Sequence, residues 1–254
     1  MNYPIKRISE LTKADVAGIC DHTFLARPES YIKEGKENGR GAVRVWEEKF
    51  NSFLDETKSM LNKPYAICVR PENVFVAKNK AGKNIVVASV IGFPNSQSYL
   101  LSYQLSETDL AMNHGADEID MVLRYDLVQG GKYKEAFRIV DRLTKKVHEG
   151  KCLIKLILET CELTSRQIRE CSIRAEDLGV DFIKTSTGFG KFGAKVKDLE
   201  IMAKNFSRGI KISGGINKEN YLALIATASR KNDGMVELNP MKIRIGESSL
   251  LNRL

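Results

Sequence analysis

Residues 181–190 have the sequence DFIKTSTGFG, which is the most informative segment of the chain for its architecture. Its apolar start contains one lysine, Lys184, and its second half consists of hydroxyl residues, glycine and one phenylalanine. A short apolar run that ends in turn-forming residues is typical of a strand buried on both faces, as in a parallel sheet. Outward in both directions, LIKLIL at 153–158 and GIKIS at 209–213 repeat the pattern. We therefore expect a set of parallel strands.

Runs of this kind recur eight times, and segments with helical spacing of apolar residues separate most of them. Such alternation predicts parallel strands covered by helices, and eight units close into a (β/α)8 TIM barrel rather than an open sheet. The length of 254 residues suits one barrel, so we expect a single domain over residues 1–254. The expected strands span 19–24, 66–69, 85–91, 118–123, 153–158, 181–185, 209–213 and 243–246.

Composition and charge exclude several classes of protein. With 43% hydrophobic and 28% charged residues, the sequence is that of a globular protein rather than a disordered or fibrous one. No run of about 18 apolar residues could span a membrane, and no apolar leader follows the N-terminal charges. We therefore expect a cytoplasmic protein without a membrane partner. The net charge of +8 is scattered over all segments, which argues against binding to nucleic acid.

The least regular region runs from Arg27 to Arg44, where the sequence ESYIKEGKENGRG is polar and interrupted by glycine. We expect a loop or lid there that extends the first crossover. Apolar residues then recur at helical spacing from Val43 to Leu61, which predicts an amphipathic helix. The barrel is thus expected to carry a polar loop and helix extension at about 27–61.

Charged residues stand inside runs that should be buried. Strand side chains alternate between the two faces, so a lysine flanked by isoleucines that pack outward must point into the barrel. Each such residue alone is better explained by a side chain that reaches solvent at a strand end, or by a core ion pair. Four neighbouring strands with such a residue argue for a site instead. The residues are Asp120, Lys155, Lys184 and Lys211, joined by Asp21 on the first strand.

Two inward lysines on adjacent strands, Lys184 and Lys211, affect each other in a poorly solvated barrel mouth. Desolvation and like-charge repulsion both favour the neutral amine, so the pKa of one lysine should fall. A neutral amine can attack a carbonyl to form an imine. Asp120 and Lys155 could offset the remaining charge and move protons through a water. Glu118 and Glu159 could also point inward, in support of these groups.

Glycine and serine follow several expected strands. In α/β barrels a phosphate commonly binds in the loops after the seventh and eighth strands, held by backbone N–H groups. Each glycine or serine pair alone would more often form a turn or a helix cap. Their coincidence with these loops indicates a phosphate site. Gly214, Gly215, Ser248 and Ser249 fall in these loops, and Gly188, which follows the sixth expected strand, is also a candidate phosphate-binding residue.

The motifs together resemble the 2-deoxyribose-5-phosphate aldolase family, a class I (Schiff-base) aldolase family, in order along nearly the whole chain. The matching stretches are DHTFL, AICVRPENV, ASVIGFP, GADEIDMV, LIKLILET, DFIKTSTGF, IKISGGI and RIGESSL. The resemblance implies that Lys184 forms the Schiff base, that Lys211 lowers its pKa and that Asp120 relays protons with a water. Asp21 and Lys155 match supporting positions.

The resemblance further implies reversible cleavage of 2-deoxy-D-ribose 5-phosphate to D-glyceraldehyde 3-phosphate and acetaldehyde, in deoxynucleoside breakdown. The expected partner is a small phosphorylated sugar. Neither a metal nor an organic cofactor is expected, and a homodimer is suggested. The alternatives are a class I aldolase for another sugar phosphate, or a catalytically silent barrel that binds a phosphorylated ligand or nucleic acid.

The chain departs from the family near the expected phosphate site. Phe189 stands where some relatives have lysine, and Asn217 stands where many have a basic residue. Lys191 or Lys218 could substitute for these cations.

Overall fold

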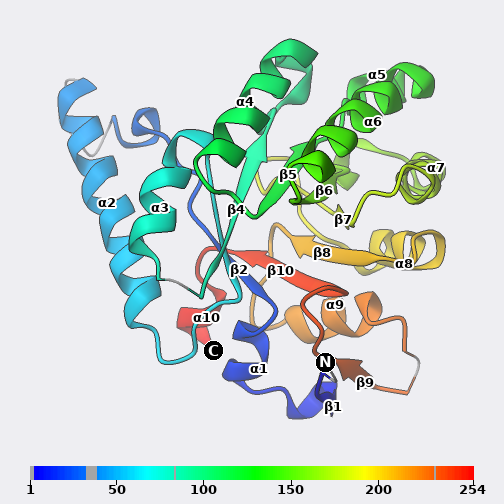
Figure 1. The fold of residues 1–254 in the computed structure, drawn as a ribbon. Coiled ribbons are helices and arrows are strands. Elements are labelled where there is room, and N and C mark those ends of the chain that lie inside the picture. The colour runs from blue at the N-terminus through cyan, green and yellow to red at the C-terminus, as the bar shows by residue number, and fades with distance from the viewer. Residues whose placement is uncertain (1–2, 33–38, 83, 232) are drawn as a thin grey trace.

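The computed structural model describes residues 3–32, 39–82, 84–231 and 233–254. Eight parallel strands form a closed barrel in the order β10-β2-β3-β4-β5-β6-β7-β8 (Figure 1). This confirms the (β/α)8 barrel and all eight expected strands. The barrel strands are β2 (Cys20–Thr23), β3 (Ala66–Val69), β4 (Val86–Ile91), β5 (Glu118–Val122), β6 (Leu153–Ile157), β7 (Phe182–Lys184), β8 (Gly209–Ser213) and β10 (Ile243–Glu247).

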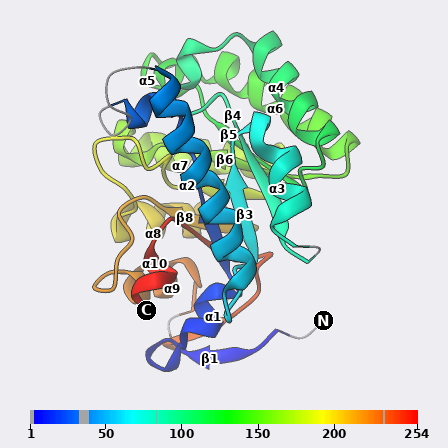
Figure 2. The same cartoon turned by 90° about the vertical axis from the view of Figure 1, so that its left-hand side faces the viewer.

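Helices cover the outside of the barrel, as Figures 1 and 2 show from two sides. The helix α6 illustrates why, because its buried residues recur every three or four positions and face the strands. The α-helices are α1 (Lys13–Ala17), α2 (Gly39–Ser59), α3 (Val74–Lys80), α4 (Leu101–Asn113), α5 (Tyr125–Gln129), α6 (Tyr133–Glu149), α7 (Ser165–Asp177), α8 (Val196–Asn205), α9 (Tyr221–Ala228) and α10 (Leu250–Arg253). Short 3-10 turns lie at Ile8–Glu10, Pro28–Tyr31, Pro71–Asn73, Ser96–Ser98 and Thr160–Glu162.

The strand register places the charged residues of neighbouring strands side by side. Asp120 on β5 pairs with Lys155 on β6, and Lys184 on β7 pairs with Lys211 on β8. Apolar residues such as Ile183 alternate with them and pack in the main hydrophobic core. Because alternation sends every second side chain to the same face, the ionisable groups all point into the barrel.

The extension at 27–61 differs in part from the prediction. Residues 33–38 of the expected loop lie outside the described residues, but residues 39–44 are helical, because α2 begins at Gly39. Glycine within the first turn therefore did not prevent a helix, whose apolar residues Phe50 and Phe53 are buried. The expected helix also ends early: α2 stops at Ser59, and Leu61 is 96% exposed.

A second, small sheet was not predicted. It consists of β1 (Ile5–Arg7) and β9 (Met235–Glu237), which pair antiparallel outside the barrel. In Figure 1 it lies at the bottom of the molecule, near the N-terminus. Each strand has three residues, too few to show alternation in the sequence. None of the described helices has the length and apolar character needed to cross a membrane.

Candidate active site

A cluster of buried charged residues fills the barrel. We call it the barrel cluster; it consists of Asp21, Glu118, Asp120, Lys155, Lys184, Lys211 and Arg244. Its centre is Asp120, which accepts hydrogen bonds from three lysines. Lys155 Nζ lies 2.8 Å from Oδ1, while the Nζ atoms of Lys184 and Lys211 lie 3.0 and 2.7 Å from Oδ2. The structure thus brings together all five residues singled out in the sequence.

Two further members complete the cluster. Arg244 on β10 donates to Asp21 Oδ1 from Nε at 2.6 Å, and to Glu118 Oε2 from Nη2 at 3.0 Å. Glu118 also accepts a 2.5 Å hydrogen bond from Lys155, in line with the inward position considered for it. Arg244 was missed, although it alternates with Ile243 and Ile245 as Lys211 alternates with its own isoleucines. The same alternation rule would have found it.

The two adjacent lysines differ in their electrostatics. Burial, and then the charge of Lys211, hold the pKa of Lys184 below its ordinary value. Burial also disfavours the charge of Lys211, but Asp120 and Asp21 outweigh this effect and raise the pKa of Lys211. Burial likewise works against the charge of Asp120, but its lysine neighbours hold its pKa well below the ordinary value. Lys184 is therefore the lysine that most readily becomes a neutral amine.

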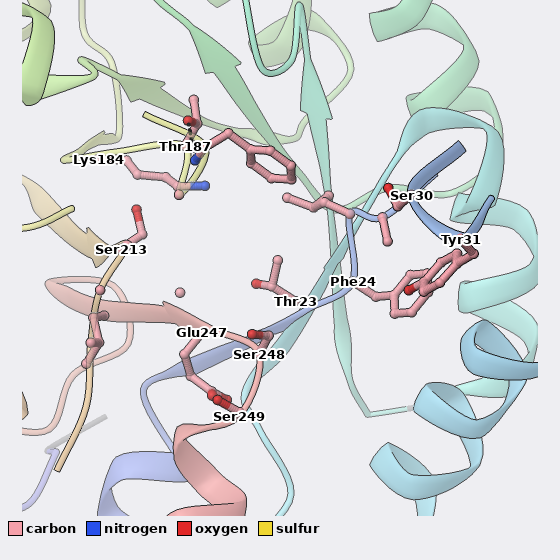
Figure 3. Close-up of a pocket in the computed structure, with 18 residues that line it drawn as sticks. Thr23, Phe24, Ser30, Tyr31, Lys184, Thr187, Ser213, Glu247, Ser248 and Ser249 are labelled. Atoms are coloured by element: carbon pink, nitrogen blue, oxygen red, sulfur yellow. Dashed lines mark hydrogen bonds between the residues drawn. The ribbon is translucent and has the colours of Figure 1, made fainter. Parts of the chain in front are cut away.

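A pocket of about 440 Å³ opens at the carboxyl ends of β2, β7, β8 and β10. Lys184 is the only member of the barrel cluster that lines it, and its amine points into the space between the surrounding loops (Figure 3). A small molecule in the pocket would thus meet one reactive amine. The rest of the lining is Thr23, Phe24, Leu25, Ala26, Ser30, Tyr31, Thr187, Gly188, Phe189, Ser213, Gly214, Gly215, Ile216, Gly246, Glu247, Ser248 and Ser249.

The five candidate phosphate-binding residues all line this pocket. Gly214 and Gly215 have φ values of +82° and +67°, a region that side chains other than glycine rarely occupy. The backbone also approaches closely here, since a Cβ on Gly193 would lie 2.0 Å from the carbonyl oxygen of Gly214. Lys191 and Lys218, the two suggested substitutes for a phosphate-binding cation, do not line the pocket, and Lys191 contacts Glu162 at 3.4 Å.

Two glutamates support the loops around the pocket. Glu247, at the end of β10, accepts a hydrogen bond from the backbone N–H of Leu250 and lies 3.2 Å from His22 Nδ1. Glu159 binds both the backbone N–H and the hydroxyl of Thr187, one of the pocket residues. Glu159 also has a left-handed backbone, with φ of 54°, directly after β6. Sequence reasoning missed Glu247, because its partners lie far away in the chain.

Known proteins resemble the chain over most of its length. The model of the family described as DeoC/LacD family aldolase matches residues 21–253. A deoxyribose-phosphate aldolase of Thermococcus gammatolerans is 38% identical over 174 residues, which cover 66% of this chain and 76% of that protein. One of Streptococcus pyogenes is 32% identical and covers 84% of this chain and 89% of that protein. The solved structure of an aldolase designated QR15 is 25% identical, covers 93% of both chains and has a TM-score of 0.73.

Proposed function

Because the chain belongs to the DeoC/LacD family of aldolases, we propose that it cleaves 2-deoxy-D-ribose 5-phosphate reversibly to D-glyceraldehyde 3-phosphate and acetaldehyde through an imine on Lys184. Similarity to proteins named deoxyribose-phosphate aldolase supports the substrate. The observation that carries the mechanism is the position of Lys184, whose amine contacts Asp120 of the barrel cluster and also lines the pocket.

The first half of the reaction forms the imine. The neutral amine of Lys184 attacks the aldehyde carbon of the open-chain sugar and gives a carbinolamine. Loss of water from the carbinolamine leaves an iminium ion, which acts as an electron sink. Asp120, which accepts a hydrogen bond from Lys184, is the proposed group for moving protons through a bound water.

The second half breaks the carbon–carbon bond. Removal of the proton from the 3-hydroxyl group makes that carbon a carbonyl, and the electrons of the C2–C3 bond move into the iminium. D-Glyceraldehyde 3-phosphate leaves, and an enamine remains on Lys184. Protonation of the enamine at C2 and hydrolysis of the resulting imine release acetaldehyde and restore the amine. Every proton taken up is thus returned, and no redox partner is needed.

The remaining groups are assigned supporting roles. We propose that Lys211 keeps the pKa of Lys184 low, while Asp21 and Lys155 hold the charges of the barrel cluster in place. The 5-phosphate is proposed to bind the backbone and hydroxyl groups of Gly188, Gly214, Gly215, Ser248 and Ser249. Deoxynucleoside breakdown in the cytoplasm is the proposed setting, and the homodimer remains a prediction.

One observation favours a second candidate, an aldolase for a different sugar. Among the pocket residues in the described part of the chain, Lys184 is the only cation and Glu247 is the only carboxylate. A phosphate dianion gains most from fixed positive charge near its oxygens. A pocket of this composition also suits a sugar or aldehyde that carries a hydroxyl group instead of the phosphate.

Trapping the imine tests the proposal. The protein is incubated with acetaldehyde and borohydride, and ethylated lysines are located by peptide mass spectrometry. We expect ethylation at Lys184 and retention of the other buried lysines in unmodified form. Folded protein without any adduct at Lys184 would contradict the imine mechanism and favour a barrel that only binds its ligand. Turnover assays with 2-deoxyribose 5-phosphate and other sugar phosphates then identify the substrate.

A further inference from the structure

The barrel cluster holds unequal numbers of positive and negative groups. Its three carboxylates belong to Asp21, Glu118 and Asp120, while its four basic groups belong to three lysines and Arg244. With every group ionised, the cluster would carry one net positive charge in the interior of the barrel. An uncompensated buried charge is costly, so the cluster favours the release of one proton.

Contacts decide which group gives up that proton. Lys155 binds both Glu118 and Asp120, and Lys211 binds both Asp21 and Asp120. Lys184 contacts a single carboxylate, Asp120, at the longest of the lysine distances in the cluster. Deprotonation of Lys184 therefore removes fewer ion pairs than deprotonation of Lys155 or Lys211.

Arg244 is the basic group that makes the numbers unequal. It is fully buried, lies 2.5 Å from Asp21 and 3.0 Å from Glu118, and stacks over Tyr65 with 4.1 Å to the ring centroid. A guanidinium keeps its proton under all ordinary conditions. Arg244 consequently compensates two carboxylates permanently and leaves less negative charge to hold a proton on Lys184.

We propose that Arg244 is a positioning residue for the aldolase reaction: by compensating Asp21 and Glu118, it keeps the amine of Lys184 in its neutral, nucleophilic form. This inference rests on the proposed function of Lys184. Asp120 on β5 contacts Lys184 directly, and Lys211 on β8 and Cys68 on β3 also act on the charge of its amine. Arg244 contacts none of them, and acts through the carboxylates that it shares with Lys155 and Lys211.

The proposal makes predictions of opposite sign for two variants. Arg244→Met leaves three lysines facing three carboxylates, so all lysines are compensated and the pKa of Lys184 should rise. Glu118→Gln leaves four basic groups facing two carboxylates, so the pKa of Lys184 should fall further. The double variant Arg244→Met/Glu118→Gln restores the excess of one basic group and should return the pKa to the wild-type value. Arg244→Lys keeps the charge and should also behave as wild type.

The measurement is the rate of acetylation of Lys184 by acetic anhydride between pH 6 and 11, followed by peptide mass spectrometry. The exposed Lys145 in the same sample provides the reference rate. This measurement reports the protonation of Lys184 and needs no turnover. Its result is therefore independent of imine trapping, which tests the proposed function. A purely structural role of Arg244 would lower the amount of folded protein but would not move the titration midpoint in opposite directions.

We expect the midpoint to rise by at least about one pH unit in Arg244→Met and to fall by a similar amount in Glu118→Gln. The surface variant Arg174→Met, which removes an arginine paired with Glu170, should leave it unchanged. If Arg244→Met does not fold, the titration midpoints of Lys184 in Glu118→Gln and in the double variant test the proposal instead. A midpoint that stays at the wild-type value in Glu118→Gln, or that moves in the same direction in every variant, would overturn the proposal.

Discussion

Lys184 and Lys211 share one oxygen atom, Oδ2 of Asp120, which lies 3.0 Å from the first amine and 2.7 Å from the second. The two residues are register partners on β7 and β8, yet only Lys184 lines the pocket. Lys211 has a second carboxylate, Asp21, at 2.5 Å, which fixes its positive charge. One lysine is thus placed for a reaction with substrate and the other for an electrostatic effect on its neighbour.

The first prediction concerns the nucleophile. Lys184→Leu should abolish turnover, because no other amine of the barrel cluster lines the pocket. The fold should persist, since burial already disfavours the charged form of the amine that the variant removes. Turnover of 2-deoxyribose 5-phosphate and circular dichroism check both points, with Lys145→Leu on the surface as the control. Full activity of Lys184→Leu would exclude the imine on this residue.

The second prediction separates the role of Lys211 from that of Lys184. Lys211→Leu removes a positive charge next to Lys184, so the pKa of Lys184 should rise and less of it should be neutral at pH 7. We expect a loss of activity of roughly 100- to 1,000-fold at pH 7, with partial recovery as the pH is raised. Lys184→Leu should show no recovery. Equal, pH-independent losses in both variants would contradict the assignment.

Asp120→Asn provides the third prediction. The amide keeps the shape of the carboxylate but cannot compensate the lysines that contact it, and it is a poor proton acceptor. We expect turnover to fall by roughly 1,000-fold, whereas Glu10→Gln on the surface should have no effect. Rates of cleavage and of proton exchange at the methyl group of acetaldehyde measure the relay. Retention of both rates would show that another group moves the protons.

Most of the barrel could be predicted from the sequence because its signals are local. Each barrel strand is a short apolar run. Because side chains alternate between the two faces of a strand, the lysine within GIKIS or DFIKTS is predicted to point inward. Arg244 obeys the same rule in KIRIGES, so its inward position also follows from the sequence alone.

Other features depend on contacts between distant segments. The pairing of β1 with β9 joins strands of three residues from the two ends of the chain, and nothing in either segment indicates the other. The contact between His22 and Glu247 likewise spans 225 positions. The glycines near residue 39 predict a loop, because glycine is usually a sign of irregular structure, but α2 begins at Gly39.

The fourth prediction follows from Asp21, whose burial raises its pKa but whose neighbours Arg244 and Lys211 outweigh burial and lower it to about 2. A carboxyl group whose pKa is lowered by folding stabilises the protein at pH values above its unfolded-state pKa of 3.8. This stabilisation is lost as the pH falls towards 2. The loss should amount to about 2 kcal/mol. Denaturant unfolding between pH 5 and 2 measures it: Asp21→Asn should lack this part of the slope, while Asp141→Asn should retain it. Parallel curves for all three proteins would contradict the ion pairing.

The last prediction concerns selectivity for phosphate. Burial raises the pKa of Glu247, but His22 and the N–H of Leu250 outweigh burial and hold the carboxylate in its charged form. This charge lies beside Ser248 and Ser249 at the proposed phosphate site (Figure 3). Like charges repel, so Glu247 should weaken binding of a phosphate dianion without affecting a neutral hydroxyl group.

Glu247→Gln tests this effect, because glutamine removes the charge and keeps an acceptor oxygen for Leu250, while its NH2 group takes the place of the oxygen that faces His22. We expect kcat/KM for 2-deoxyribose 5-phosphate to rise by about tenfold, while kcat/KM for unphosphorylated 2-deoxyribose changes less than about twofold. Phe189→Lys, which adds a cation to the pocket rim, should shift selectivity in the same direction. A parallel change for both sugars in Glu247→Gln would mean that the glutamate supports only the loop, because a structural effect does not depend on the charge of the substrate.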